Sequence, residues 1–255
     1  MNILVTGGAG FIGTNLIKRL LKEGHNVVSL DNYSTGKEEN EQKGCVYHNV
    51  DIRDAVDFDF FMEKPDVIYH LAALPRIQPS FEYPALTLEI GMLGTMNILE
   101  WARNKNCKVI YSGSSSVHSG HYKNPYTFSK VMGDELCMGY KRMFDVDVKV
   151  CRFYNVYGPY QLTEGEYCTV IGIFKKQYDE GVELTITGDG FQRRDFTHVD
   201  DIVEGLILTS KSDKFDLDFV ELGRGKNYSI NQLSEMFGCG FTYIPARPGE
   251  ARETL

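Results

Sequence analysis

Two residues of this sequence have the types and the spacing that acid–base chemistry at a hydroxyl group requires. Tyr126 and Lys130 stand four positions apart in a stretch with helical periodicity, and residues at that spacing share one face of a helix. A free tyrosine has a pKa of about 10 and is a weak base at neutral pH. Because a neighbouring ammonium favours the phenolate, we expect Tyr126 to exchange a proton with the substrate and Lys130 to support it.

A run of serines supplies further hydroxyl groups close to this pair. The run extends from Ser112 to Ser116 and directly follows an apolar segment that is typical of a buried strand. The carboxyl ends of parallel strands form the ligand-binding edge of doubly wound sheets. We therefore expect the serine run to lie beside the tyrosine and the lysine.

Three glycines near the start of the sequence indicate a dinucleotide site. Gly7, Gly10 and Gly13 follow the apolar segment 3–5 and precede a segment with helical periodicity. Glycine lets the backbone approach a pyrophosphate, and the N-terminus of the helix offers free N–H groups and a positive dipole. Asp31 ends the next apolar segment, where a carboxylate accepts hydrogen bonds from ribose hydroxyls and repels a 2′-phosphate. The pattern therefore predicts NAD rather than NADP.

These residues require a scaffold in which apolar strands alternate with helices. Alternation of this kind is typical of a mostly parallel sheet covered on both faces. We therefore expect an α/β fold with a Rossmann-type, doubly wound parallel sheet. Strands are predicted at 3–5, 27–30, 45–50, 67–71, 108–112 and 148–153, and helices at 11–21, 84–104 and 126–143.

The alternation changes after Gly158-Pro159. A polar, turn-rich segment follows, and then a helix at about 168–180 and a strand at 183–187 are predicted. We expect this part to be a smaller C-terminal region that binds the substrate. The predicted division places 1–157, with 196–212 returning to it, in the NAD-binding domain, and places 158–195 and 213–255 in the smaller region.

Composition excludes several classes of partner. The 255 residues include 27 Lys and Arg against 35 Asp and Glu, for a net charge of −8, which disfavours nucleic acid and anionic membranes. Six cysteines without a CxxC pair suit free thiols in a reducing compartment, and no metal site is expected. The first predicted strand begins at residue 2, and no apolar run reaches the length of a membrane span. We therefore expect a cytoplasmic protein without a signal peptide.

Longer motifs extend over essentially the whole sequence. They are GGAGFIG (7–13), Asp31-Asn32, Asp51-Ile52, HLAA (70–73), PYTFSK (125–130), RFYNVYGP (152–159), GDGFQRRDF (188–196) and RPGE (247–250). In this order they resemble the extended short-chain dehydrogenase/reductases, and among them the NAD-dependent nucleotide-sugar epimerases and dehydratases. The resemblance implies an enzyme that binds NAD and a UDP-linked sugar.

The resemblance also implies roles for single residues. The implied catalytic set is Ser114, Tyr126 and Lys130, and the implied contacts to the nucleotide sugar are Asn155, Arg194 and Arg247. A guanidinium is a suitable fork-shaped donor for phosphate. The residues that the resemblance places at NAD are Gly7, Gly10, Phe11, Ile12, Asp31, Asn32, Ser34, Gly36, Asp51, Ile52, Leu71, Ala72, Ala73, Ser112, Tyr126, Lys130 and Tyr154.

Two positions bear on the reaction. Ser115 and Ser116 stand where the related 4,6-dehydratases carry Asp-Glu and where UDP-glucuronate decarboxylases usually retain the Glu. Hydroxyl groups do not readily replace those carboxyl groups, so the sequence favours C4 epimerisation through a 4-keto sugar. The expected substrates are UDP-glucose and UDP-galactose or their N-acetyl forms. The open alternatives are a dehydratase, a decarboxylase, a ketoreductase and a catalytically weak NAD-binding protein.

The sequence departs from the relatives in two further places. Only a dozen residues separate Ser114 from Tyr126, where relatives carry a longer loop, and the sequence stops at Leu255, where relatives continue for several dozen residues. Both departures leave full activity open.

Thr254 falls near a position whose bulk limits N-acetylated sugars in the family, and a small residue there leaves room for UDP-GlcNAc.

The helix predicted at 126–143 carries a possible contact surface. Met132, Leu136, Tyr140 and Met143 recur in it at helical spacing, and the related epimerases often pair through the helix that follows their tyrosine. We therefore expect a homodimer.

Overall fold

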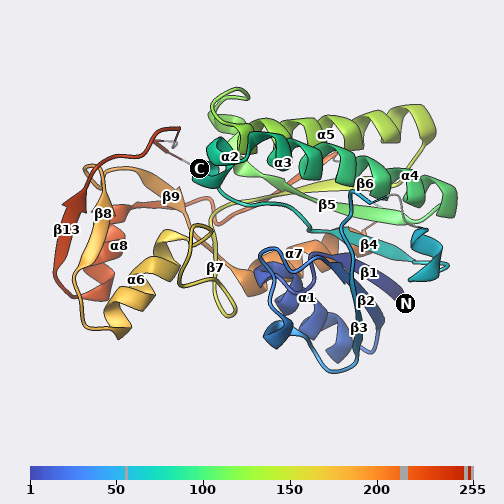
Figure 1. Ribbon diagram of the computed structural model, residues 1–255, viewed down its shortest axis with the longest axis horizontal. Helices are drawn as coiled ribbons and strands as arrows, with labels where there is room; N and C mark the ends of the chain where they lie inside the picture. Colours follow the sequence, from blue (N-terminus) through green and yellow to red (C-terminus); the bar gives the residue numbers. More distant parts are fainter. Residues whose placement is uncertain (55–56, 213–217, 250–251, 254–255) are drawn as a thin grey trace.

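A seven-stranded parallel sheet forms the centre of the computed structural model, which describes residues 1–54, 57–212, 218–249 and 252–253 (Figure 1). Every paired neighbour in this sheet runs parallel. The strand order is β11-β6-β5-β4-β1-β2-β3. The strands are β1 (Asn2–Thr6), β2 (Asn26–Asp31), β3 (Cys45–Asn49), β4 (Val67–His70), β5 (Lys108–Ser114), β6 (Val148–Phe153) and β11 (Phe219–Leu222).

The central strands are apolar along their length because both faces of the sheet are covered. All four residues of β4 are buried, as are the four residues Ile3–Thr6 of β1. This burial explains why they form continuous apolar runs rather than an alternating pattern. The doubly wound α/β sheet is confirmed, as are the six strands that the sequence predicts for it and the strand predicted at 183–187.

Helices cover both faces of the sheet (Figure 1). On one face α1 (Phe11–Lys22) and α7 (Val199–Lys211) pack around Leu16, Leu20 and Leu206. On the other face α4 (Thr95–Lys105) and α5 (Pro125–Phe144) pack around Ile98, Leu99 and Met138. The sheet order reverses between β1 and β4, and such a switch opens a crevice at the carboxyl ends of the strands.

The helix predicted at 84–104 has three parts in the structure. They are α3 (Pro84–Glu89), a π-helical segment (Ile90–Gly94) and α4. A Cβ on Gly94 would lie 2.4 Å from Cδ1 of Ile52. Glycine at this position therefore lets the π-helical segment pack directly on Ile52.

Two elements differ from the sequence prediction. The sequence predicts that 213–255 belongs to the smaller region, whereas β11 pairs with β6 as the edge strand of the central sheet. The loop after β4 contains a short helix, α2 (Ile77–Glu82), that the sequence did not predict. The segment Phe219–Leu222 is only four residues long, so its periodicity carries too little information for an assignment.

The smaller region lies beside the carboxyl ends of the central strands (Figure 1). Its core gathers Phe174, Leu184, Ile186, Phe196 and Leu233. In this region β8 pairs with β13, β9 with β12, and β7 with β10. Its elements are β7 (Val156–Tyr157), α6 (Val170–Asp179), β8 (Leu184–Thr187), β9 (Arg193–Asp195), β10 (Thr197–His198), β12 (Asn227–Ser229), α8 (Ile230–Phe237) and β13 (Phe241–Ile244).

Three short 3-10 helices complete the elements: Glu38–Asn40, Phe58–Phe60 and Ser115–Ser119. Within the described ranges, none of the helices combines the length and the apolar character that a membrane crossing needs. All six cysteines are free thiols. The described residues contain no group of His, Cys, Asp and Glu that fits a metal ion.

Candidate active site

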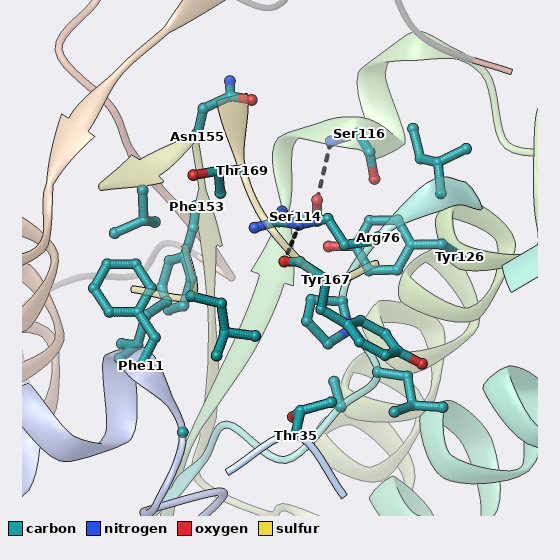
Figure 2. Close-up of a pocket in the computed structure, with 18 of the residues that line it drawn as sticks. Phe11, Thr35, Arg76, Ser114, Ser116, Tyr126, Phe153, Asn155, Tyr167 and Thr169 are labelled. Carbon is teal, nitrogen blue, oxygen red and sulfur yellow. Dashed lines mark hydrogen bonds between the residues drawn. The ribbon is translucent and has the colours of Figure 1, made fainter. Parts of the chain in front are cut away.

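One cavity of about 460 Å³ lies at the carboxyl ends of the central strands and reaches into the smaller region. Its lining includes every residue proposed for catalysis, for NAD and for the sugar nucleotide, with the exception of Gly36. Figure 2 shows part of this lining, with Ser114, Tyr126 and Asn155 around one space. A Cβ on Gly36 would lie 3.0 Å from Oδ1 of Asp31. Gly36 therefore permits close packing behind the carboxylate.

The glycine turn after β1 leaves backbone open toward the cavity. Gly7 has a φ of +74°, and a Cβ there would lie 2.8 Å from the amide nitrogen of Ala72. A Cβ on Gly13 would lie 2.2 Å from the carbonyl oxygen of Gly7. Gly10 caps α1 without a side-chain hydrogen bond, so the first turn of the helix retains donors for an anion. The turn therefore fits the pyrophosphate of a dinucleotide.

The carboxylate of Asp31 is buried at the end of β2. It accepts hydrogen bonds from the amides of Ala9 at 2.9 Å and Tyr33 at 2.8 Å. Burial raises the pKa of Asp31, and these backbone donors oppose the shift. These bonds hold the carboxylate in one orientation in the cavity wall. This placement is compatible with the predicted role of Asp31 as an acceptor for the ribose hydroxyls of NAD.

Asn32 and Asp51 meet at the same end of the cavity. Nδ2 of Asn32 donates to Oδ2 of Asp51 at 3.0 Å. The guanidinium of Arg53 also donates to Asp51, and it lowers the pKa of that carboxyl to about 2. Asp51 therefore stays ionised at neutral pH.

Tyr126 lies in the first turn of α5, at the catalytic end of the cavity. Asn124 caps this helix by accepting a hydrogen bond from the amide of Thr127 at 2.7 Å, and Pro125 occupies the first helical position. These residues favour helix initiation just before the tyrosine. The phenol lies beside the side chain of Ser114 (Figure 2). Burial raises the pKa of Tyr126, while Ser114 and the charge of Arg76 oppose that shift.

Lys130 lies one turn along α5 and is buried. Its Nζ donates to the carbonyl oxygen of Ser112 at 2.7 Å and lies 5.1 Å from the ring centre of Tyr111. Burial lowers the pKa of Lys130 to about 8, against the opposing charge of Asp134. The sequence predicts that this ammonium supports the phenolate of Tyr126 and holds the nicotinamide ribose, and in the structure it also donates to Ser112.

Arg76 is a cavity residue that the sequence reasoning missed. Its Nε donates to the carbonyl oxygen of Tyr167 at 2.8 Å. Figure 2 shows the guanidinium beside Ser114 and the hydroxyl end of Tyr126. The only available signal was an isolated arginine in the otherwise uncharged segment 71–81, which no periodic pattern distinguishes.

The three residues proposed for the sugar nucleotide lie on the other side of the cavity, in or near the smaller region. Asn155 follows β6, and its Nδ2 donates to the carbonyl oxygen of Asp195 at 3.1 Å. Arg194 lies in β9, and Arg247 follows β13 and is exposed. All three line the cavity. Thr254, which the sequence connected with sugar size, falls outside the described residues.

Comparisons with known proteins agree with this geometry. The chain is 34% identical over 227 residues to the UDP-glucose 4-epimerase of Mycolicibacterium smegmatis, which covers 81% of this chain and 72% of that protein. It is 31% identical over 254 residues to UDP-glucuronic acid decarboxylase 1 of Xenopus tropicalis, covering 92% of this chain and 59% of that protein.

A solved structure shows the same fold. The UDP-glucose 4-epimerase of Thermotoga maritima, determined with UDP-glucose, superimposes with a TM-score of 0.92 at 29% identity. The match covers all of this chain and 89% of the other. Residues 3–217 match the NAD dependent epimerase/dehydratase family. The chain is therefore an enzyme of the NAD dependent epimerase/dehydratase family.

Proposed function

We propose that this chain is an NAD-dependent nucleotide-sugar 4-epimerase that acts on UDP-linked sugars. The observation that carries the proposal is the placement of Ser114 beside Tyr126 at the catalytic end of a cavity whose serine run lacks carboxyl groups (Figure 2). This pair suffices to move the proton of one sugar hydroxyl, and the hydride on its carbon would go to NAD. The similarity to enzymes named UDP-glucose 4-epimerase supports the same reaction.

In the proposed reaction, the O4 hydroxyl of the sugar binds between Ser114 and Tyr126. Tyr126, as phenolate, accepts the O4 proton while the C4–H bond breaks, and Ser114 donates a hydrogen bond to O4. Bound NAD supplies the acceptor, and then the donor, of the C4 hydride. The 4-keto sugar turns over within the cavity, and Tyr126 returns the proton to O4 when the other face of C4 is reduced.

The other residues proposed for the site have roles in binding. The glycine turn is proposed to hold the pyrophosphate of NAD, and Asp31 its adenosine ribose. Asn32, Ser34, Asp51, Ile52 and the residues Leu71–Ala73 are proposed to line the rest of the cofactor site, with Phe11, Ile12, Ser112 and Tyr154. Gly36 would support Asp31 from behind. Asn155, Arg194 and Arg247 are proposed to bind the diphosphate of the sugar nucleotide, because a guanidinium matches the geometry of phosphate oxygens.

Decarboxylation and dehydration are the second group of candidate reactions, since one relative is named a UDP-glucuronic acid decarboxylase. The carboxylates that line the cavity within the described ranges are Asp31, Asp51 and Glu166. Asp31 and Asp51 lie at the adenosine end proposed for NAD, and Glu166 is exposed on the loop before α6. The positions after Ser114 therefore offer hydroxyl groups where an elimination needs an acid and a base, which favours epimerisation.

We also infer a homodimer and a cytoplasmic location. Met143 and Phe144 at the end of α5 are exposed, as are Leu93 and Met96 on the neighbouring helical segment. Exposed apolar side chains on adjacent helices support a protein contact. Leu136 and Tyr140, in contrast, pack against the core, so the contact would use only part of the predicted stripe. The six free thiols support a reducing compartment.

Proton NMR tests the proposed reaction. Purified protein is incubated separately with UDP-glucose, UDP-GlcNAc and UDP-glucuronate, with and without added NAD. A new anomeric signal of the C4 epimer from one of them is the expected result. Unchanged spectra with NAD bound, or release of a pentose nucleotide or a 6-deoxy-4-keto sugar, would contradict it.

A further inference from the structure

Arg76 brings a positive charge to the catalytic end of the cavity. It lies between β4 and α2, and its guanidinium is beside Ser114 and Tyr126 (Figure 2). Its charge lowers the pKa of the Tyr126 phenol against the effect of burial. The proposed catalytic set does not require this arginine, because Ser114 and Tyr126 already act on O4.

Arg76 has a polar contact but no balancing charge within the described part of the chain. Its Nε donates to a neutral carbonyl oxygen, that of Tyr167, and no described carboxylate forms an ion pair with it. Other partly buried arginines of this chain do have such partners. Arg53 pairs with Asp51 at 2.8 Å, and Arg152 pairs with Asp134 at 2.9 Å. Burial lowers the pKa of Arg76, and a bound anion would relieve the cost of burying its charge.

The backbone at Arg76 has a strained conformation. Its φ is +105° and its ψ is +141°, a region that residues other than glycine rarely adopt. Such strain persists when the surrounding structure over-determines the conformation, and it is frequent at ligand sites. The strained residue lies directly before α2, so the local backbone sets the direction in which the side chain leaves the main chain.

Ser116 adds a buried hydroxyl to the same end of the cavity. Its Oγ is buried and makes no hydrogen bond with the residues that the structure describes, and Ser116 lines the same cavity as Arg76. Its backbone amide donates to Oγ of Ser114 at 3.2 Å, which places Ser116 immediately beyond the serine proposed to bind O4. A buried hydroxyl without a partner costs free energy that a bound acceptor recovers.

The chemistry of the sugar identifies the anion. If O4 lies at Ser114 and Tyr126, the diphosphate on C1 is at the opposite end of the ring, where the proposal assigns it to Arg194 and Arg247. The exocyclic C6, carried by the carbon next to C4, then lies at the end occupied by Arg76 and Ser116. In a neutral hexose C6 is an alcohol, and in a uronic acid it is a carboxylate, which an arginine binds well.

We propose that Arg76, assisted by Ser116, selects a nucleotide sugar whose C6 is a carboxylate, so that the preferred substrate class is a UDP-linked uronate. This inference rests on the proposed function, because it needs O4 at Ser114 and Tyr126. It changes the preferred substrate from the neutral and N-acetylated sugars expected from the sequence to uronic acids.

Binding measurements separate this inference from the reaction itself. Isothermal titration calorimetry on the NAD-loaded protein gives the Kd of UDP-glucuronate and of UDP-glucose. Since a charged hydrogen bond contributes about 1.5–3 kcal/mol, the wild type should bind UDP-glucuronate about 10- to 100-fold more tightly. Arg76→Gln should reduce that ratio to about one, and Arg76→Lys should restore part of it. We measure binding and not turnover, because removing the charge of Arg76 would also raise the pKa of Tyr126.

The controls distinguish recognition from folding. Arg103→Gln removes an exposed arginine that pairs with Glu100 and should preserve the ratio, and Ser116→Ala should lower it less than Arg76→Gln does. Equal affinity of the wild type for both sugars would overturn the inference. An equal loss of affinity for both nucleotide sugars in a folded, NAD-loaded Arg76→Gln would also overturn it, because that result would place the arginine at the diphosphate. Selective uronate binding without any C4 epimer in the NMR assay would support carboxylate recognition by Arg76 and refute the proposed function.

Discussion

The ammonium of Lys130 donates a hydrogen bond of 2.7 Å to the carbonyl oxygen of Ser112. This bond joins α5 to the end of β5, two residues before Ser114, and so connects the two elements that carry the proposed catalytic pair. Because Lys130 is buried, the bond is part of the scaffold as well as part of the site.

The first prediction concerns the stability that Lys130 contributes at different pH. Its pKa falls from 10.5 to about 8 in the folded protein, so between these values the unfolded chain holds the proton and the folded chain does not. Stability relative to Lys130→Met should therefore rise, by about 1–3 kcal/mol, as the pH increases through this window. Urea unfolding of both proteins across the window measures it. A stability difference between the two proteins that stays constant, or that falls as the pH rises, would contradict the lowered pKa of Lys130.

Tyr126→Phe tests the proton transfer. Removing the phenol hydroxyl should lower kcat for C4 epimerisation by about 10²- to 10⁴-fold, the usual contribution of a general acid–base, while NAD stays bound. Tyr122→Phe is a matched control, because Tyr122 is 88% exposed just before α5. Turnover of Tyr126→Phe within tenfold of the wild type would rule out the proposed role.

Asp31→Ser tests the choice of cofactor. Loss of the carboxylate removes the proposed acceptor for the ribose hydroxyls, so the affinity for NAD should fall about 10- to 100-fold. The preference for NAD over NADP should shrink as well, because the charge that repels a 2′-phosphate is gone. Fluorescence titration with both dinucleotides gives the two Kd values. Asp145→Asn, at an exposed position after α5, is the control; unchanged discrimination in Asp31→Ser would refute the proposal.

A pair of Gly→Ala variants separates close packing from helix propensity. In Gly13→Ala the new Cβ would lie 2.2 Å from the carbonyl oxygen of Gly7, whereas in Gly139→Ala it would lie 3.4 Å from Cε of Met143. Gly13→Ala should destabilise the protein by about 1–3 kcal/mol and weaken NAD binding. Gly139→Ala should stabilise α5 by about 0.5–1 kcal/mol. Thermal unfolding with and without NAD checks both signs, and an unperturbed Gly13→Ala would show that the turn has room to adjust.

The inferred homodimer is tested by light scattering coupled to size exclusion. The wild type should have twice the monomer mass at micromolar concentration. Met143→Glu, a change at a 68% exposed position, should shift the mass toward the monomer without loss of NAD, because a charge disfavours an apolar contact. A monomer mass for the wild type would remove the inference.

The scaffold was predictable from the sequence because its signals are local. Strands such as β1 and β4 are buried on both faces and form apolar runs, and the glycine turn stands where a strand passes into a helix. The approach of Tyr126 and Lys130 to the same cavity was predictable because a helix places residues four positions apart on one face.

The parts that the sequence did not predict depend on tertiary contacts. Whether Lys130 donates to Ser112 or elsewhere depends on how α5 packs on β5, which helical spacing does not specify. Arg76 lies in an irregular loop with a positive φ, and no periodicity distinguishes it. The strand β11 is short, and its pairing with β6 is non-local. Each of these features depends on segments far apart in the chain.

The most direct test of the proposed reaction follows the hydrogen on C4. UDP-glucuronate and UDP-glucose labelled with deuterium at C4 are each incubated with the NAD-loaded protein, and the products are analysed by NMR and mass spectrometry. An epimerase that removes and returns the same hydrogen yields the C4 epimer with deuterium still at C4 and with all sugar carbons present. Loss of the label to solvent, or a product that has lost carbon dioxide or water, would contradict the account.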